Sequence, residues 1–127
     1  MRLLLSCITA LLFISASAQS DSVSQVASFK STAHSFGKIK QHVPVTTEFK
    51  FTNTSDKNVI VETATAECGC TTPEYPKTPI EKGKTGEIKV TYNAESPGKF
   101  TKRVTVKFAN VKQPIILTIE GEVVTAP

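Results

Sequence analysis

The feature that most constrains the fold of this 127-residue chain is the alternation of apolar and polar residues over short segments. Successive side chains of a β-strand point to opposite faces, so this period of two predicts strands with one buried and one exposed face. The alternation is clear in four segments: 45–52, 87–93, 100–108 and 115–123. It is weaker in two others: 26–33 and 59–66. No segment of ten or more residues has a helical period, so the sequence predicts an all-β fold.

Turn-forming residues separate these segments. Residues 53–58 and 96–98 are rich in Asn, Ser, Pro and Gly, and residues 110–114 divide the last two segments. Six or seven short strands joined by such turns predict an antiparallel β-sandwich of two sheets, with a small closed barrel as the alternative. An antibody-type domain is excluded, because the chain has no Trp and Cys68 and Cys70 are too close in sequence to connect facing sheets.

The N-terminus has the pattern of a cleaved secretory signal. Met1 and Arg2 give a positive start, residues 3–14 are mostly apolar, and Ala16-Ser17-Ala18 precedes the expected cleavage point. The apolar run is shorter than the roughly 20 residues that a membrane span needs. Cys7 lies inside this run and not after it, so we assign it to the signal and not to a lipid anchor.

The sequence therefore divides into a signal peptide at 1–18, a polar, flexible lead-in at 19–25 and a β-sandwich domain at 26–124. We expect a protein exported to the periplasm or the cell surface of a bacterium, with no transmembrane segment in the mature chain. The formal net charge of the whole chain is +4, and its lysines are spread along the sequence. Because no basic block or stripe is present, we expect no nucleic-acid partner.

The segment 67–73, Glu-Cys-Gly-Cys-Thr-Thr-Pro, is the chemically unusual part of the chain. Cys68 and Cys70 are two residues apart, which is about 6.6 Å in an extended strand, and Gly69 allows the backbone to bend enough for a disulfide. A ring that small would be strained and easily reduced. Two alternatives stay open: a pair of packed thiols, or a weak site for a soft metal such as copper or zinc, for which His34 and His42 are further candidate ligands.

The proline-rich segment 73–86 follows the cysteines. It could cross between the two sheets with Ile80 closing the edge of the core, or it could present Tyr75 to a partner. The sequence has no nucleophile elbow, zinc-protease motif or phosphate-binding glycine loop, so we expect neither catalytic residues nor a cofactor. Asn53-Thr54-Ser55 matches a glycosylation sequon.

Several blocks of the sequence occur in the order found in one bacterial family. They are residues 34–39 (His-Ser-Phe-Gly-Lys-Ile), 49–54, 68–73, 79–86, 98–100 and 117–123. The chain resembles the domain-of-unknown-function family 1573 over roughly residues 29–124. The motif and turn residues are Phe36, Gly37 and Ile39 in one block and Gly69, Thr71 and Pro73 in another. His42 stands where such sequences often have Gly, which affects the expected geometry of that turn.

The resemblance implies an exported, immunoglobulin-like β-sandwich with no assigned catalytic residues. We therefore expect a non-enzymatic module that binds or scaffolds a protein partner. Two other functions stay open. One is a thiol-redox or copper-handling protein that uses Cys68 and Cys70. The other is an assembly partner that adds a strand to another chain.

Overall fold

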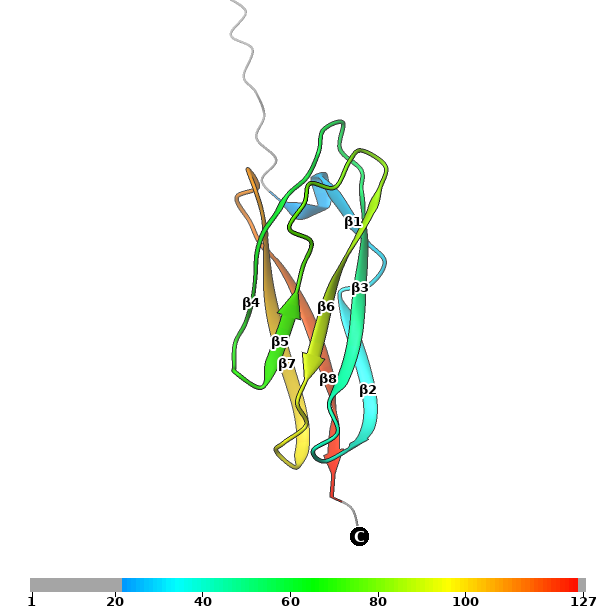
Figure 1. Cartoon of the computed structure of the whole chain (residues 1–127), viewed down its shortest axis with the longest axis vertical. Helices are drawn as coiled ribbons and strands as arrows, with labels where there is room; N and C mark the ends of the chain where they lie inside the picture. Colours follow the sequence, from blue (N-terminus) through cyan, green and yellow to red (C-terminus); the bar gives the residue numbers. More distant parts are fainter. Residues whose placement is uncertain (1–21, 126–127) are drawn as a thin grey trace, which may run out of the picture.

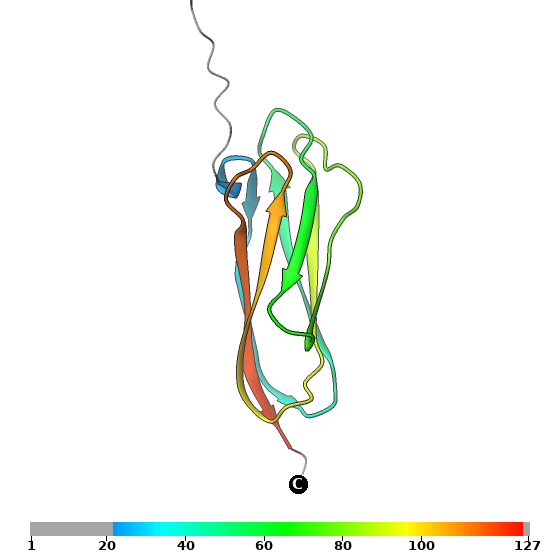
Figure 2. The same cartoon turned by 90° about the vertical axis from the view of Figure 1, so that its left-hand side faces the viewer.

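The structure, a computed structural model, describes residues 22–125 as a β-sandwich of two four-stranded sheets (Figures 1 and 2). The predicted signal peptide and the first part of the lead-in lie outside the described residues. One sheet has the order β1-β3-β6-β5 and the other the order β2-β8-β7-β4. The elements in chain order are η1 (Val23–Gln25), β1 (Ala27–Phe29), β2 (Ala33–Lys40), β3 (Val45–Asn53), β4 (Val61–Ala66), β5 (Thr71–Glu74), β6 (Thr85–Tyr92), β7 (Gly98–Phe108) and β8 (Ile115–Val124).

The inward-facing residues of the two sheets form one hydrophobic core. Phe51 of β3 and Phe108 of β7 meet edge to face with 5.4 Å between ring centroids, and Phe29 of β1 packs on both rings. Ile88, Val90, Val104, Val106, Leu117 and Ile119 are buried around them. Each such side chain contributes about 1.5–3 kcal/mol when it leaves water, which makes this core the main source of stability.

The four segments with clear alternation form β3, β6, β7 and β8, with ends that differ by at most two residues from those expected. The all-β fold and the two-sheet sandwich are therefore confirmed, although the sandwich has eight strands and not about seven. Within residues 22–125, no helix is long and apolar enough to cross a membrane.

The prediction of a single strand over residues 26–33 is wrong, because this segment contributes to two strands in different sheets. The chain leaves the first sheet after Phe29 and enters the second sheet at Ala33, so that β1 pairs with β3 whereas β2 pairs with β8. The β2–β8 pairing is parallel, which corrects the prediction of a purely antiparallel sandwich. Alternation defines which face of a strand is buried, but it carries no information about the neighbouring strand or its direction.

The lead-in at 19–25 ends earlier than predicted. Residues 23–25 form the 3-10 helix η1, and Val23 is buried in the core together with Ala27. Burial of an apolar side chain outweighs the polar character of its neighbours here. The domain therefore includes Val23, three residues before the predicted boundary.

Asn53, at the end of β3, is a buried polar residue with 1% of its surface exposed. Its Nδ2 donates to the carbonyl oxygens of Lys57 (2.6 Å) and Ile80 (2.9 Å). Its Oδ1 accepts hydrogen bonds from the backbone N–H (2.9 Å) and the hydroxyl (2.7 Å) of Ser55. Because the amide is enclosed and fully bonded, the sequon at 53–55 cannot accept a glycan in the folded domain.

Candidate functional site

The Cys68-Gly69-Cys70 segment lies in the short loop that carries the chain from β4 in one sheet to β5 in the other. The loop occupies the lower left of the view in Figure 1, and Figure 2 shows it in front. Gly69 is exposed at its tip, and a side chain built at this glycine would meet no atom within 4 Å. The two cysteines are half-buried on either side of it.

Cys68 and Cys70 form a disulfide, with 5.3 Å between their Cα atoms. This confirms the first of the three chemical states considered for the pair. The bond closes a ring over a single residue, so it does not connect distant parts of the fold.

Thr71 lies directly beneath this disulfide. Its side chain is 4% exposed, and its Oγ1 lies 3.7 Å from Cys68 Sγ and 3.6 Å from Cys70 Sγ. A disulfide sulfur has no proton, so the Thr71 hydroxyl is the donor, and its single proton is shared between the two sulfurs. A buried hydroxyl costs free energy unless it has a partner, and here both sulfurs serve as partners.

Tyr92 of β6 is the register neighbour of Thr71 and closes the core behind it. Its ring stacks on Phe100 with 4.0 Å between centroids, and 3% of its surface is exposed. Desolvation by this burial raises the pKa of the Tyr92 phenol above its ordinary value of 10.0, because the charged form loses its contact with water.

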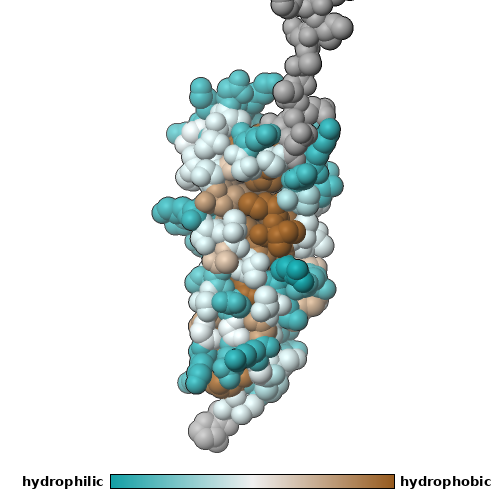
Figure 3. All heavy atoms as spheres, turned by 180° about the vertical axis from the view of Figure 1, so that it is seen from behind, coloured by the Kyte–Doolittle hydropathy of each residue, from teal (hydrophilic) through white to brown (hydrophobic). Residues whose placement is uncertain are grey.

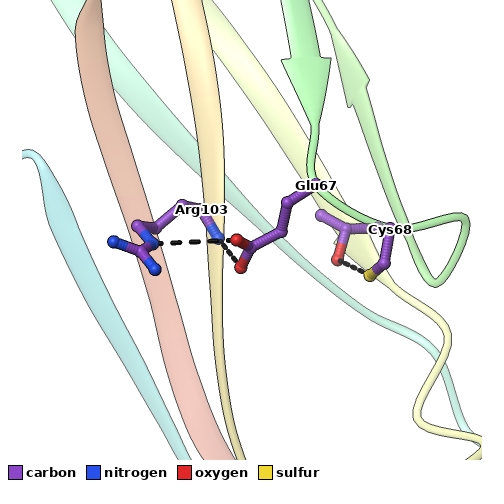
Figure 4. Close-up of polar contacts among 4 residues, drawn as sticks. Glu67, Cys68 and Arg103 are labelled. Atoms are coloured by element: carbon purple, nitrogen blue, oxygen red, sulfur yellow. Dashed lines mark hydrogen bonds and ion pairs between the residues drawn. The ribbon is translucent and has the colours of Figure 1, made fainter.

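Hydrogen bonds that do not involve sulfur hold both ends of the loop. Before the loop, Glu67 Oε1 accepts from the backbone N–H of Arg103 (2.9 Å), and Glu67 N–H donates to the Arg103 carbonyl (3.3 Å). Arg103 Nε also lies 3.7 Å from Glu67 Oε2, as Figure 4 shows. After the loop, the N–H of Asn93 donates to the carbonyl of Cys70 (3.0 Å).

A groove of about 540 Å³ adjoins the loop on the outer face of β4, β7 and β8. Its lining consists of Thr65, Ala66, Glu67, Arg103, Thr105 and Ile116. Ile116 is 42% exposed, and it is directly opposite Thr105 across the β7–β8 pair. In the alternation of segment 115–123, Ile116 shares the outward face with Thr118, Glu120 and Glu122. The sequence signal for the groove is therefore a single apolar residue among the polar residues of an outward strand face.

The outer face of the sheet β1-β3-β6-β5 has paired hydroxyl and charged side chains. Thr46 and Thr91 share a hydrogen bond of 2.8 Å between their hydroxyls, and Glu48 lies opposite Lys89. Opposite charges at cross-strand positions attract one another and stabilise the strand pair. Seen from behind, the molecule has its brown atoms gathered mainly in the upper half, between white and teal atoms (Figure 3). On this face, exposed apolar surface is therefore unevenly distributed.

The first motif block forms an irregular strand and not a turn. Gly37 has φ +67° at the point where the pairing of β2 with β8 shifts register, between Ser35 and Lys38. Glycine adopts this left-handed conformation without steric cost, so it suits the residue at which the strand is irregular. Ile39 is buried, and Phe36 is half-buried against the core. These motif residues therefore shape and anchor the edge strand.

His42 adopts φ +65° in the turn that follows β2. The departure from the family pattern at this position thus falls where the backbone is left-handed, which glycine adopts more easily than histidine. The backbone N–H of His42 donates to the carbonyl of Ala94 (2.9 Å), which holds the turn. Among residues 22–125, no three His, Cys, Asp or Glu side chains are grouped closely enough to hold a metal ion.

The proline-rich segment joins β5 to β6, which are neighbours in one sheet, so the prediction that it crosses between sheets is wrong. The crossing is made by the loop at 67–70. Pro73 lies in β5, at the edge of its sheet, where a missing N–H is tolerated. Ile80 is buried and bridges to Val59, as expected for a residue at the edge of the core. Tyr75 is half-buried, with Lys77 Nζ 3.4 Å above its ring.

Comparison with known protein families supports the resemblance drawn from the motifs. The model of a family described as "Protein of unknown function (DUF1573)" matches residues 27–123. The chain belongs to this family. The match begins at β1 and ends in β8, so the DUF1573 domain coincides with the sandwich. No curated protein matches the chain.

Solved structures show the same architecture at low sequence identity. A protein of unknown function from Porphyromonas gingivalis W83 has a TM-score of 0.66 and 13% identity, covering 76% of this chain and 46% of that one. PapD-like domain 7 of human CEP192 has a TM-score of 0.70 and 8% identity, covering 96% and 99%. The VesB protease of Vibrio cholerae has a TM-score of 0.60 and 12% identity, covering 78% and 32%.

These similarities identify the fold as a PapD-like, immunoglobulin-like β-sandwich, as the DUF1573 resemblance implied. The chain spans less than half the length of the Porphyromonas protein that it matches. At such identities the similarity concerns the fold alone.

Proposed function

We propose that this DUF1573 protein is an exported module that binds another protein through the groove around Ile116, and that it acts by binding and not by catalysis. The observation that carries the proposal is the chemistry of this groove. Ile116 provides an exposed apolar centre, and Thr65, Thr105, Arg103 and Glu67 surround it with hydrogen-bonding and charged groups. An apolar centre with a polar rim is the usual anatomy of a protein-binding surface.

The partner that fits is a protein segment with an apolar side chain for Ile116 and polar groups for the rim. The groove is open, and Arg103 and Glu67 are 65% and 41% exposed at their side chains, so a partner can reach both charges. Export is part of the proposal. It is supported by the N-terminal pattern of residues 1–18 and by the disulfide, since disulfides persist mainly in oxidising compartments.

Strand addition is less well supported as a function. The free edges of the two sheets belong to β1, β5, β2 and β4. β1 has three residues and β5 contains Pro73, whereas β2 and β4 each have a register shift. Short, bulged or proline-containing edges are the features by which β-proteins resist pairing with further strands.

The proposal is tested by photo-crosslinking in the native cell. A photoreactive amino acid at Ile116 should give one discrete adduct, and the same amino acid at Lys50, which is exposed on the other sheet, should not. Added unlabelled protein should compete for the adduct, whereas the variant Ile116→Lys should not compete. Identical adduct patterns from positions 116 and 50, or no adduct at 116, would refute the proposal. Fractionation of the same cells tests export.

A further inference from the structure

The disulfide between Cys68 and Cys70 contributes little as a structural cross-link. The entropic stabilisation from a disulfide grows with the length of the loop that it closes, and this one closes a loop over a single residue. The loop ends are already fixed by the bonds between Glu67 and Arg103 and by the Asn93–Cys70 hydrogen bond. The backbone therefore stays anchored when the sulfur–sulfur bond opens.

The disulfide is also accessible. Both cysteines are half-buried, and Cys70 packs against the hydrophobic core. Gly69 is exposed between them, and the space next to it is open. A thiolate of another molecule can therefore approach the sulfurs from the tip of the loop.

Thr71 provides a hydroxyl that can donate a hydrogen bond to the cysteine thiolate released by such an attack. Its Oγ1 lies within 3.7 Å of both sulfurs, so it can donate to whichever cysteine becomes a thiolate. A hydrogen bond to the charged form of a group favours that form. Valine would fill the same buried volume, and only the hydroxyl distinguishes threonine in this role.

We propose that the Cys68–Cys70 disulfide exchanges with the dithiol of another exported protein. A substrate thiolate attacks one of the two sulfurs, the Cys68–Cys70 bond breaks, and the other cysteine leaves as a thiolate that accepts a hydrogen bond from Thr71. The second substrate thiolate then attacks the substrate sulfur of the mixed disulfide and releases the remaining cysteine. The substrate loses two electrons and forms a disulfide, and the Cys68–Cys70 pair gains these electrons and, after protonation, becomes a dithiol.

This inference depends on the disulfide and Thr71, whereas the binding function depends on Ile116, so the two can hold or fail independently. In the first experiment, the purified protein is equilibrated with glutathione buffers of increasing reducing strength. Its thiols are alkylated and counted by mass, and its fold is followed by circular dichroism. We expect two thiols to appear while the spectrum is unchanged. If the disulfide resists reduction until the domain unfolds, the pair is a structural clip and the inference is wrong.

The second experiment separates an exchange site from an inert, reducible bond. The reduced protein is mixed with an aromatic disulfide probe, and the release of the aromatic thiol is followed over time. Thr71→Val removes the hydrogen bond that favours the charged form, so a smaller fraction of the cysteine is present as thiolate. The thiolate fraction then falls about tenfold while each thiolate gains about threefold in reactivity, so the rate falls about threefold. Thr71→Ser keeps the hydroxyl and should restore the rate.

The third experiment examines the mixed disulfide itself, using a reduced synthetic peptide with two cysteines as the substrate. Wild-type protein should oxidise this peptide mole for mole. In Cys68→Ser or Cys70→Ser the single remaining thiol, first activated as a disulfide with the aromatic thiol, should form a lasting mixed disulfide with a second peptide that has only one cysteine, because that peptide has no second thiolate to release the protein. Absence of peptide oxidation by the wild type, or a Thr71→Val rate equal to that of the wild type, would overturn the inference.

Discussion

Replacement of Asn53 by alanine tests whether the turn after β3 is held by a buried side-chain amide. The amide makes four hydrogen bonds: to the carbonyls of Lys57 and Ile80, and from the N–H and hydroxyl of Ser55. It thereby joins the end of β3 to Ile80, which lies 27 residues further along the chain. Asn53→Ala removes the side-chain atoms that make all four hydrogen bonds and alters no backbone atom.

The expected cost follows from what each partner retains. At about 0.5–1.5 kcal/mol net for each hydrogen bond, four bonds correspond to about 2–6 kcal/mol. The Ile80 carbonyl still accepts from the N–H of Val59. The hydroxyl of Ser55, which lies 2.8 Å from the Lys57 carbonyl, can donate its proton there once Asn53 Oδ1 is gone. Because neither carbonyl is left without a partner, we expect the lower part of this range, about 2–4 kcal/mol.

The assay is urea unfolding followed by circular dichroism, since the chain has no Trp for fluorescence. Asn53→Ala should lower the midpoint with an unchanged slope, and the melting temperature should fall by about 10–25 °C for a domain of this size. The matched control is Asn58→Ala in the same turn, where the side chain is exposed and the change should stay within about 0.5 kcal/mol. Equal effects at the two positions would refute this account of the turn.

Asn53→Asp refines the test because it keeps the shape of the side chain and the oxygen that Ser55 needs. It replaces the two N–H donors by an oxygen that faces the carbonyls of Lys57 and Ile80. Burial and these carbonyls should raise the pKa of the introduced carboxyl in the folded state above its unfolded value near 3.9. The stability of this variant relative to Asn53→Ala should therefore be highest at acidic pH and fall as the pH rises through the raised pKa. A relative stability that rises with pH would contradict this sign.

Three further perturbations probe other parts of the domain. The pKa of Tyr92 is raised in the folded state, so the contribution of its phenol to the free energy of unfolding should be complete below about pH 10 and should be lost as the pH rises further. In Tyr92→Phe, the free energy of unfolding should therefore fall less steeply with pH in this alkaline range. Gly121→Ala would place Cβ 2.9 Å from the ring of Phe100 and should lower the free energy of unfolding in urea by about 1–3 kcal/mol. Gly69→Ala adds the same methyl group where the space is open, and its free energy of unfolding should stay within about 0.5 kcal/mol of the wild type. Equal losses in the two variants would be inconsistent with the packing. His42→Gly removes a side chain from a residue at φ +65° and should stabilise the domain by about 1 kcal/mol, with a higher melting temperature; a lower one would show that the imidazole makes a compensating contact.

The sequence predicted the strands whose two faces differ most. β3, β6, β7 and β8 lie in the middle of their sheets, so their inner residues are buried and their outer ones contact water. That arrangement is what produces alternation. β5 was missed because it is a four-residue edge strand whose sequence, Thr-Thr-Pro-Glu, has little alternation.

The disulfide was expected from the spacing of Cys68 and Cys70 together with Gly69 between them. The residues that surround the disulfide in the fold could not be expected from this spacing. Arg103 and Ile116 are more than 30 residues away in sequence and reach the site only because β7 pairs with β4 and β8 pairs with β7. A pattern of local alternation fixes the outward direction of these side chains, but strand order decides which of them become neighbours, and a single sequence contains little information about strand order.

The parallel pairing of β2 with β8 gives the domain a mechanical direction. The blue segment η1 lies in the upper part of the domain, and β8 finishes at the lower end of the long axis (Figures 1 and 2). A force that pulls these two ends apart is directed along β2 and β8, so it loads their backbone hydrogen bonds together in shear. A force across the strands would instead break those bonds one after another. The domain should therefore withstand tension along its length better than tension applied sideways.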